Sequence, residues 1–377
     1  MTAYPRHAER LSVLGTRGRL RELAPAAGLD FASNDYLGLA TSPALRDAVT
    51  DAIRRGVPVG ATGSRLLRGN HPEHVALETM AAQFFGSEAA LYMGGGFQAN
   101  QAIFSALPMA DDLVLHDALI HASAHEGFRL GAARTESFRH NDVADAERVL
   151  RGWRNSGGRG RVWIALETIY SMQGDFAPLA DFAALAARHD AVLVLDEAHA
   201  TGVYGPLGRG FAAEITDCPV IALHTCGKAL AASGALVCAD RAVIDTLVNR
   251  ARPFIFATAP SPLMAVAARA ALEHLQRGPD CIATAARLRA HAHACARRIG
   301  YDLPPGQILP ILIRSDHAAL AAARKLQRQD FDVRAIRPPT VPKGTARLRV
   351  SITGNLGPDD ISALFTAIGD LKQKDFQ

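Results

Sequence analysis

Short apolar runs alternate with segments of helical periodicity through the middle of the chain. The almost continuously apolar runs are RVWIALE (161–167), AVLVLDEAH from residue 191, VIALHTC (220–226) and ALVCA (235–239). Strands of this composition are usually buried on both faces, and a segment with helical periodicity at 179–188 separates two of them. The pattern therefore predicts an α/β fold with a mostly parallel central sheet covered by helices on both sides.

Polar side chains stand directly after three of these runs. They are Glu167, Asp196 with His199, and the segment 225–228, which ends in Lys228. In open parallel sheets, ligands bind beyond the carboxyl ends of the strands. We therefore expect these residues to line a functional site.

The two ends of the chain have a different pattern. The first forty residues are predicted to be irregular, apart from a short strand and a turn in LDFASNDYLGLA (29–40). An Ala-rich helix follows Ser261, and ILPILIRS, FDVRAIRPP, ARLRVSIT and a closing helix near 359–371 indicate a smaller α+β domain. A chain of 377 residues is longer than a domain with a single hydrophobic core usually is. We therefore predict an N-terminal segment 1–40, a large domain 41–270 and a small domain 271–377.

Composition narrows the class of protein. Hydrophobic residues make up 49% and charged residues 21%, and the formal charge is only +4, which argues against a nucleic-acid partner. The five cysteines are an odd number without a CxxC pair, as expected for reduced thiols in a cytoplasmic protein. No apolar stretch approaches the length of a membrane span, so no membrane partner is expected.

The string DEAH at 196–199 also occurs as the acidic box of some helicases. That chemistry requires a phosphate loop of the form GxxxxGK[ST]. The one Gly-Lys pair that could serve, at 227–228, is followed by Ala229 and has Ala222 where the first Gly must stand. The nucleotidase interpretation therefore lacks a necessary part.

Lys228 supports a different chemistry. A single lysine is usually a solvated surface group. This one follows a buried strand in a segment with almost no other charge, where desolvation would lower the pKa of its amine and allow a Schiff base. A pyridoxal cofactor then needs a carboxylate for its pyridine nitrogen, which Asp196 could supply if it is not merely a helix cap, and His199 could reach the phenolic oxygen.

The segment MGGGFQAN (93–100) could bind the phosphate of such a cofactor. It follows an apolar run and opens a helical segment, and amide N–H groups at a helix start bind phosphate. A triple glycine alone could equally be a plain loop. His116, His121 and His125 could suggest a metal cluster, but no carboxylate or cysteine ligand stands at a matching spacing, so no metal is predicted.

Nearly the whole chain resembles the α-oxoamine synthases, which are pyridoxal 5'-phosphate (PLP) enzymes of fold type I. The resemblance is carried by FASNDYLGLA, GATGSRLLRGN, HVALE (74–78), GGGFQANQA, HDALIHAS, ETIYSMQGDFAPL, VLDEAHATGVYGPLGRG and HTCGKALAASGA. It departs from the family's usual residues at Gly95, Gln173 and Ala231, and none of these changes removes a group that the chemistry needs.

The resemblance implies roles for individual residues. Lys228 would bind PLP covalently, Asp196 would contact the pyridine nitrogen, His199 the phenolic oxygen, and His121 would stack on the ring as a further catalytic residue. Gly96, Phe97, Ser171 and Thr225 would contact the cofactor. Thr258 would reach the phosphate in a neighbouring subunit, which implies a homodimer with shared active sites. The substrate would contact Asn34, Thr353 and an N-terminal arginine, with Arg10 preferred over Arg6 and Arg17.

The stretch AIRPPTVPKGTARLRVSIT (335–353) most resembles the branch of the family that joins L-alanine to a pimeloyl thioester in biotin synthesis. Pimeloyl-CoA and a pimeloyl carrier protein both remain open as the acyl donor. A glycine-using acyltransferase and an aminotransferase are the alternatives that keep the cofactor. A nucleic-acid or nucleotide-binding protein of DEAH type is the remote alternative.

Overall fold

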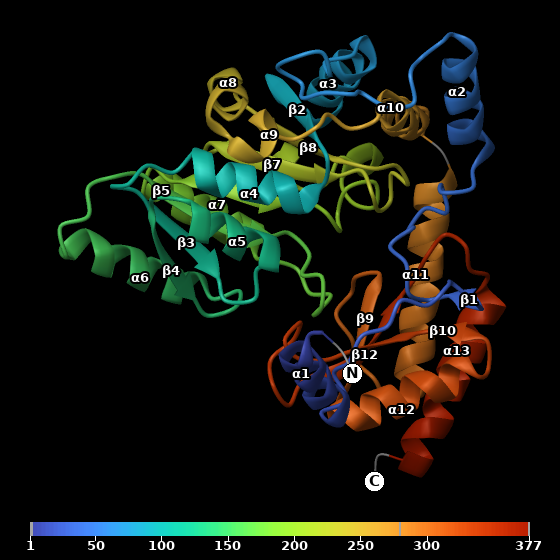
Figure 1. Cartoon of the computed structure of the whole chain (residues 1–377). Coiled ribbons are helices and arrows are strands. Elements are labelled where there is room, and N and C mark those ends of the chain that lie inside the picture. The colour runs from blue at the N-terminus through green and yellow to red at the C-terminus, as the bar shows by residue number, and fades with distance from the viewer. Residues whose placement is uncertain (1–2, 279, 376–377) are drawn as a thin grey trace. The chain divides into compact units, whose positions relative to one another are not determined.

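The structure is a computed structural model that describes residues 3–278 and 280–375 (Figure 1). The chain forms two compact units. Unit 1 comprises the chain up to Tyr36, the short segment Met172–Asp175 and the chain from Thr284 onward. Unit 2 comprises Leu37–Ser171 and Phe176–Ala283. We propose that unit 2 is the predicted large domain and that unit 1 joins the predicted N-terminal segment to the small domain.

Unit 2 is built on a seven-stranded sheet with the order β2-β8-β7-β6-β5-β3-β4. The strands from β4 to β7 are parallel, and β8 runs antiparallel to both β7 and β2. The predicted mostly parallel sheet is therefore confirmed. The strands are β2 (Ala89–Met93), β3 (Leu113–Asp117), β4 (Arg134–Phe138), β5 (Val162–Glu167), β6 (Val192–Asp196), β7 (Val220–Thr225) and β8 (Ala235–Ala239).

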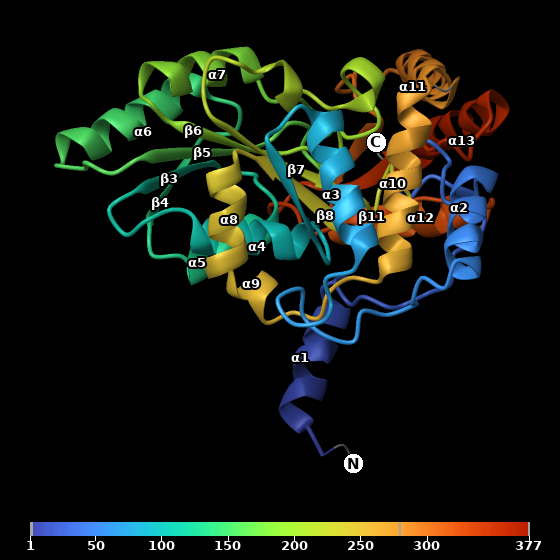
Figure 2. The same ribbon diagram turned by 90° about the horizontal axis from the view of Figure 1, so that it is seen from above.

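The apolar runs of the sequence are strands covered on both faces. Val192 and Val194 of β6 point into one hydrophobic cluster, while Leu193 and Leu195 point into another on the opposite face. Figure 2 shows α6 and α7 on one face of the sheet and α4, α5 and α8 on the other. The helices of unit 2 are α2 (Pro43–Arg54), α3 (Pro72–Phe85), α4 (Gly96–Ala106), α5 (Ala122–Leu130), α6 (Val143–Asn155), α7 (Leu179–Arg188), α8 (Arg241–Arg250), α9 (Arg252–Ile255) and α10 (Pro262–Gln276).

Unit 1 is an α+β unit, as the C-terminal pattern predicted. It contains a three-stranded antiparallel sheet of order β11-β12-β9 and a parallel pair of β1 with β10. Its core includes Leu309, Leu348 and Leu364, all at most 1% exposed. The elements are β1 (Leu29–Asp30), β9 (Ile308–Arg314), β10 (Phe331–Asp332), β11 (Arg334–Ile336), β12 (Ala346–Ser351), α12 (Asp316–Gln327), α13 (Pro358–Asp375) and most of α11 (Asp280–Arg298).

One prediction for the N-terminus is wrong. The first forty residues were expected to be irregular, but Pro5–Thr16 form helix α1. Proline at the first helical turn favours this start, since its missing N–H would have no helical partner there. No residue of α1 is buried within the chain, so the helix lacks the core-facing apolar periodicity on which the sequence interpretation relied.

Helices α4 and α5 pack closely at a glycine. A Cβ atom on Gly127 of α5 would lie 2.8 Å from the backbone oxygen of Asn100 and 2.9 Å from Cβ of Phe104, both in α4. Gly127 therefore allows the two backbones to approach. Because α4 opens at the glycine-rich segment and α5 begins after His121, this packing also positions candidate site residues.

Replacing Gly127 with Ala should lower the free energy of unfolding by about 1–3 kcal/mol, because the methyl group would have to displace α4. Gly152→Ala is the matched control. Gly152 lies on the exposed side of α6 with nothing within 4 Å of the added Cβ, so alanine there should stabilise by about 0.5–1 kcal/mol. Chemical denaturation of both variants tests the pair, and equal effects would show that the close approach at Gly127 is unimportant.

Candidate active site

Three neighbouring strands end in polar residues at one edge of the sheet of unit 2. Glu167 ends β5 and is opposite Asp196 at the end of β6, while Thr225 ends β7 beside β6. The parallel register brings these residues together although the sequence separates them. These polar residues do lie at the carboxyl ends of neighbouring strands, and their part in a functional site stays a prediction.

Lys228 lies in a loop immediately after β7. Its Nζ is 2.8 Å from Nε2 of His199, which lies in the turn that follows β6. Backbone hydrogen bonds hold the loop, from Cys226 N to the oxygen of Gly234 and from Ala231 N to the oxygen of Lys228. The amine of Lys228 is half-buried beside an imidazole, where it can form a covalent link to an aldehyde.

Asp196 is held by two hydrogen bonds. Its Oδ2 accepts one from Nδ2 of Asn100 at 2.8 Å, and its Oδ1 accepts one from the backbone N–H of Ala198 at 3.0 Å. The second bond is the capping role that the sequence left open, so Asp196 caps a turn and still presents a carboxylate beside the site. A carboxylate in this position can keep a pyridine nitrogen protonated.

His121 is connected to Asp196 through a chain of hydrogen bonds. Nδ1 of His121 is 2.8 Å from the hydroxyl of Ser123, which accepts a hydrogen bond from Nδ2 of Asn100 at 2.9 Å. The same amide group binds Asp196. His121 is also the N-cap of α5 and is an exposed residue, and its stacking on a cofactor ring stays a prediction.

Helix α4 offers a binding site for a phosphate. It begins at Gly96 with Gly95 as the N-cap, and the first amide N–H groups of a helix have no partner inside the helix. A Cβ atom added to Gly96 would lie 3.7 Å from Oγ1 of Thr225, so this helix start lies next to the end of β7. Phe97 is 49% exposed, which leaves its ring accessible to a ligand.

Two further residues of unit 2 were predicted to contact the cofactor. Ser171 is buried, and its backbone N–H donates to Oε2 of Glu167 at 3.0 Å. Thr258 is exposed and forms an isolated antiparallel bridge with Ser64. Ser171 therefore lies beside the strand ends, while Thr258 lies in a segment paired with the loop after Gly60.

Two buried glutamates lie at the strand ends. Burial, together with the charge of Asp196, raises the pKa of Glu167 to about 8. Burial also raises the pKa of Glu197 to about 7, although its carboxylate accepts hydrogen bonds from Phe211 N, Ala212 N and the hydroxyl of Thr168. Glu197, the second residue of DEAH, therefore holds the following loop in place.

The predicted substrate residues lie in unit 1. Oδ1 of Asn34 accepts a hydrogen bond from Nη2 of Arg349 at 3.0 Å, and the buried hydroxyl of Thr353 donates to the backbone oxygen of Asp30 at 2.9 Å. Arg10 is exposed on α1, and the shallow cavity beside it is lined by side chains of the same helix alone. The structure therefore does not group Arg10 with Asn34 and Thr353.

Sequence reasoning assigned no role to several residues that these contacts single out. Asn100 bonds Asp196 and lies on the buried face of α4. The sequence contained a signal for this position, because Asn100 stands three and four residues before the apolar Ile103 and Phe104. Arg349 is 6% exposed on β12, and a buried guanidinium can bind a carboxylate in bidentate fashion. A small cavity of about 70 Å³ is lined by Arg19, Arg21, Arg337 and Thr340, among others, and its charge suits an anion.

The side chains of unit 2 fit PLP. An amine, a carboxylate and two imidazoles lie at one edge of the sheet, and a glycine-rich helix start follows β2. PLP would need the amine for a covalent link, the carboxylate for a charged pyridine nitrogen, and the helix start for its phosphate. The fold and the site are those of a PLP-dependent transferase of fold type I.

Comparisons with known proteins give the family. The sequence profile of the family "Aminotransferase class I and II" matches residues 26–368. An 8-amino-7-oxononanoate synthase of Anaeromyxobacter dehalogenans is 41% identical over 92% of this chain and 89% of that protein. One from Methylobacterium nodulans is 40% identical over 96% of this chain and 94% of that protein. The chain belongs to the aminotransferase class I and II family and, within it, to the family of 8-amino-7-oxononanoate synthases.

Solved structures agree with this assignment. The serine palmitoyltransferase of Sphingomonas wittichii superposes with a TM-score of 0.87 at 26% identity, covering 99% of this chain and 98% of that one. The 8-amino-7-oxononanoate synthase of Francisella tularensis gives a TM-score of 0.78 at 26% identity, covering 93% and 99%. The protein is thus a PLP-dependent enzyme that transfers acyl groups. Every helix within residues 3–278 and 280–375 is too short or too polar to span a membrane.

Glu197→Gln should change how stability depends on pH. Because the folded pKa of Glu197 is about 7, above its ordinary value of 4.5, the folded state holds a proton that the unfolded chain loses as the pH rises between these values. Wild-type stability should therefore decline over that window, and the glutamine variant should lack this decline. The difference in melting temperature, variant minus wild type, should increase from about pH 5 to about pH 7.5.

Glu126→Gln, at a partly exposed position of α5 where Glu126 pairs with Arg129 at 2.6 Å, controls for the loss of one carboxylate. A difference between Glu197→Gln and wild type that stays constant with pH would show that Glu197 ionises normally in the folded protein.

Proposed function

We propose that the enzyme catalyses the decarboxylating condensation of L-alanine with a pimeloyl thioester, in biotin synthesis. The products are 8-amino-7-oxononanoate, carbon dioxide and the free thiol, which is CoA or a carrier protein. The observation that carries the proposal is the placement of Lys228 beside His199 in a chain 41% identical to a synthase of that name. The sequence of residues 335–353 resembles the branch of the family that uses a pimeloyl thioester, which supports this choice of acyl donor.

The roles of the residues of unit 2 follow from their positions. When bound, PLP supplies an electron sink that makes the α-proton of the amino acid acidic. Asp196, fixed by Asn100, would hold the proton on the pyridine nitrogen, and His199 would bind the phenolic oxygen. Lys228 would hold the cofactor, and its Nζ would also take the α-proton of the amino acid. Its Nζ lies 2.8 Å from Nε2 of His199, which could accept or return that proton.

Further cofactor contacts would come from His121, stacked on the ring, and from Gly96, Phe97, Ser171 and Thr225. In unit 1, Asn34, Thr353 and Arg10 are proposed as substrate residues, and Arg349 joins them because its buried guanidinium is bonded to Asn34. The arginine-lined cavity with Arg21 and Arg337 is the better candidate for the anionic acyl donor, since several guanidinium groups lie together there and Arg10 is exposed on its own helix.

We propose that the enzyme is a homodimer with shared active sites. Several large apolar side chains are exposed near Thr258 and in the loop paired with it, namely Val59 (75%), Leu66 (50%), Leu67 (80%) and Phe256 (70%). Apolar groups that gather on one surface favour a protein partner, and a second copy would bury them. A cytoplasmic location also stays a prediction, consistent with five free cysteines.

Lys228→Ala should reduce turnover by at least about a thousandfold, because proton abstraction loses its base. In the wild type, borohydride should abolish the yellow colour of the covalently bound cofactor. The variant should lack this colour from the start. Its melting temperature without PLP should stay near that of the wild type. Lys325→Ala, on α12 of unit 1, is the control and should keep both properties. Near-normal turnover by Lys228→Ala would contradict the assignment of the lysine.

Thiol release tests the reaction itself. Pimeloyl-CoA, acetyl-CoA and succinyl-CoA are each paired with alanine, glycine or serine, and we expect release only with pimeloyl-CoA and alanine. Preference for a short acyl-CoA with glycine would keep the fold and the cofactor but favour the glycine-using alternative. Transfer of the amino group to a keto acid without thiol release would favour an aminotransferase. A colourless protein that binds nucleic acid would support the DEAH alternative.

A further inference from the structure

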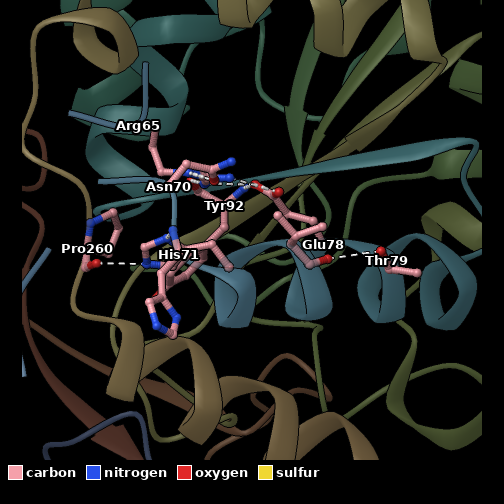
Figure 3. Close-up of polar contacts among 9 residues, drawn as sticks. Arg65, Asn70, His71, Glu78, Thr79, Tyr92 and Pro260 are labelled. Carbon is pink, nitrogen blue, oxygen red and sulfur yellow. Dashed lines mark hydrogen bonds and ion pairs between the residues drawn. The ribbon is translucent and has the colours of Figure 1, made fainter. Parts of the chain in front are cut away.

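A buried ion pair lies next to the strand that leads into the glycine-rich segment. Nη1 and Nη2 of Arg65 each donate to one carboxylate oxygen of Glu78 at 2.9 Å (Figure 3). Nε of Arg65 donates to Oδ1 of Asn70 at 2.8 Å. Only 8% of the Arg65 side chain and 15% of the Glu78 side chain are exposed. Arg65, Asn70, Glu78 and Tyr92 are called the Arg65 cluster below.

The ion pair binds backbone groups of β2 that a neighbouring strand would otherwise bind. β2 is at the end of the sheet order, and among the described strands it pairs with β8 alone. Every second residue of β2 therefore directs its backbone groups away from the sheet. At Tyr92 both outward groups are bound by the pair. The backbone N–H of Tyr92 donates to Oε1 of Glu78 at 2.8 Å, and Nη1 of Arg65 donates to the backbone oxygen of Tyr92 at 3.2 Å.

Tyr92 connects this pair to the loops on which the cofactor site depends. Only Met93 separates it from Gly94–Gly96, where α4 begins. Its hydroxyl donates to the backbone oxygen of Ser233 at 2.6 Å, in the loop that follows Lys228. A Cβ atom on Gly234 would lie 2.4 Å from the Tyr92 ring, so that loop also packs against the ring.

The other side of the Arg65 cluster is fixed to the segment around Thr258. The backbone N–H of Ala259 donates to the oxygen of Gly63 at 2.9 Å, and Ser64 forms a bridge with Thr258. Nδ1 of His74 accepts from the backbone N–H of His71, so Nε2 carries the hydrogen and donates to Pro260 O at 2.9 Å. Burial and the charge of Arg65 lower the pKa of His74 to about 4, which keeps this imidazole neutral.

We propose that Arg65 and Glu78 are positioning residues that set the geometry of the phosphate-binding segment Gly94–Gly96, and with it the affinity for the phosphate of the cofactor. This inference rests on the proposed assignment of that segment and of Lys228. Neither side chain needs to touch the cofactor. They act through the backbone of Tyr92, which they hold at both its N–H and its C=O group.

A general stabilising role is the alternative. An ion pair that only strengthens unit 2 would, on removal, lower the melting temperature and weaken all ligands of the site alike. A positioning role predicts a selective loss, because PLP and pyridoxal differ only in the phosphate group. The ratio of the dissociation constants of pyridoxal and PLP therefore separates the two roles.

The experiment uses the full-length protein freed of cofactor and titrated with PLP or pyridoxal, without substrate, while the absorbance of the bound cofactor is followed. Arg65→Met should raise the dissociation constant of PLP by about tenfold to a hundredfold, as residues that orient a ligand's direct partners commonly do. The dissociation constant of pyridoxal should change less than threefold, on the order of experimental scatter.

Arg269→Met is the matched control. Arg269 is a partly buried arginine that binds Glu73 and Glu273 at 2.9 Å each, and it joins α10 to α3. Its removal should lower the melting temperature without changing the ratio of the two dissociation constants. Arg65→Lys and Glu78→Gln cover the case that Arg65→Met does not fold, since each keeps part of the hydrogen-bond set, and both should shift the ratio in the same direction by a smaller factor.

An unchanged ratio in the Arg65 and Glu78 variants that fold, together with a lowered melting temperature, would overturn the inference and leave a stabilising role. The outcome does not depend on the substrates, because no reaction is measured in the titration. If the proposed condensation is wrong, thiol release fails while the titration of wild-type protein with PLP remains normal. If the lysine assignment is wrong, Lys228→Ala still gives the absorbance of covalently bound PLP.

Discussion

Asp196 is held in place by helix α4 and by the turn that follows its own strand, and the arrangement of the site depends on this constraint. A carboxylate that must face a cofactor cannot rotate freely, and here Asn100 of α4 and the backbone of Ala198 fix its two oxygens. The same Asn100 amide binds Ser123, which fixes His121. The Asn100 amide, on the helix that begins at Gly96, thus binds Asp196, the predicted contact of the pyridine nitrogen. Through Ser123 it also fixes His121, the residue predicted to stack on the ring.

The sheet and its functional edge could be predicted from the sequence because both follow from local patterns. β5, β6 and β7 are apolar on both faces, and the polar residues that end them must lie at one edge of a parallel sheet. Asn100 and Arg349 escaped prediction because their partners, Asp196 and Asn34, are 96 and 315 residues away in the chain. No local periodicity encodes such pairs. Helix α1 was missed because none of its residues is buried within the chain.

The comparisons explain why fold and reaction must be argued separately. A serine palmitoyltransferase superposes on this chain with a TM-score of 0.87, higher than the 0.78 of a synthase from Francisella tularensis. Backbone similarity therefore identifies the cofactor scaffold but does not separate the members of the family by substrate. The curated relatives at 40–41% identity carry the synthase name, whereas the two solved structures are each 26% identical to this chain. We propose that substrate choice resides in side chains such as those around Arg349 and Arg337.

The short segment Met172–Asp175 belongs to unit 1, although the chain on both sides of it belongs to unit 2. Nη1 of Arg347 donates to the oxygen of Met172, and Gly174, at φ +72°, lies so close to the backbone of Ile308 that a side chain would collide with it. The polypeptide therefore passes between the units four times, after Tyr36, Ser171, Asp175 and Ala283. Neither unit is encoded by one continuous stretch of gene. Recombination with a single crossover therefore cannot exchange one unit intact.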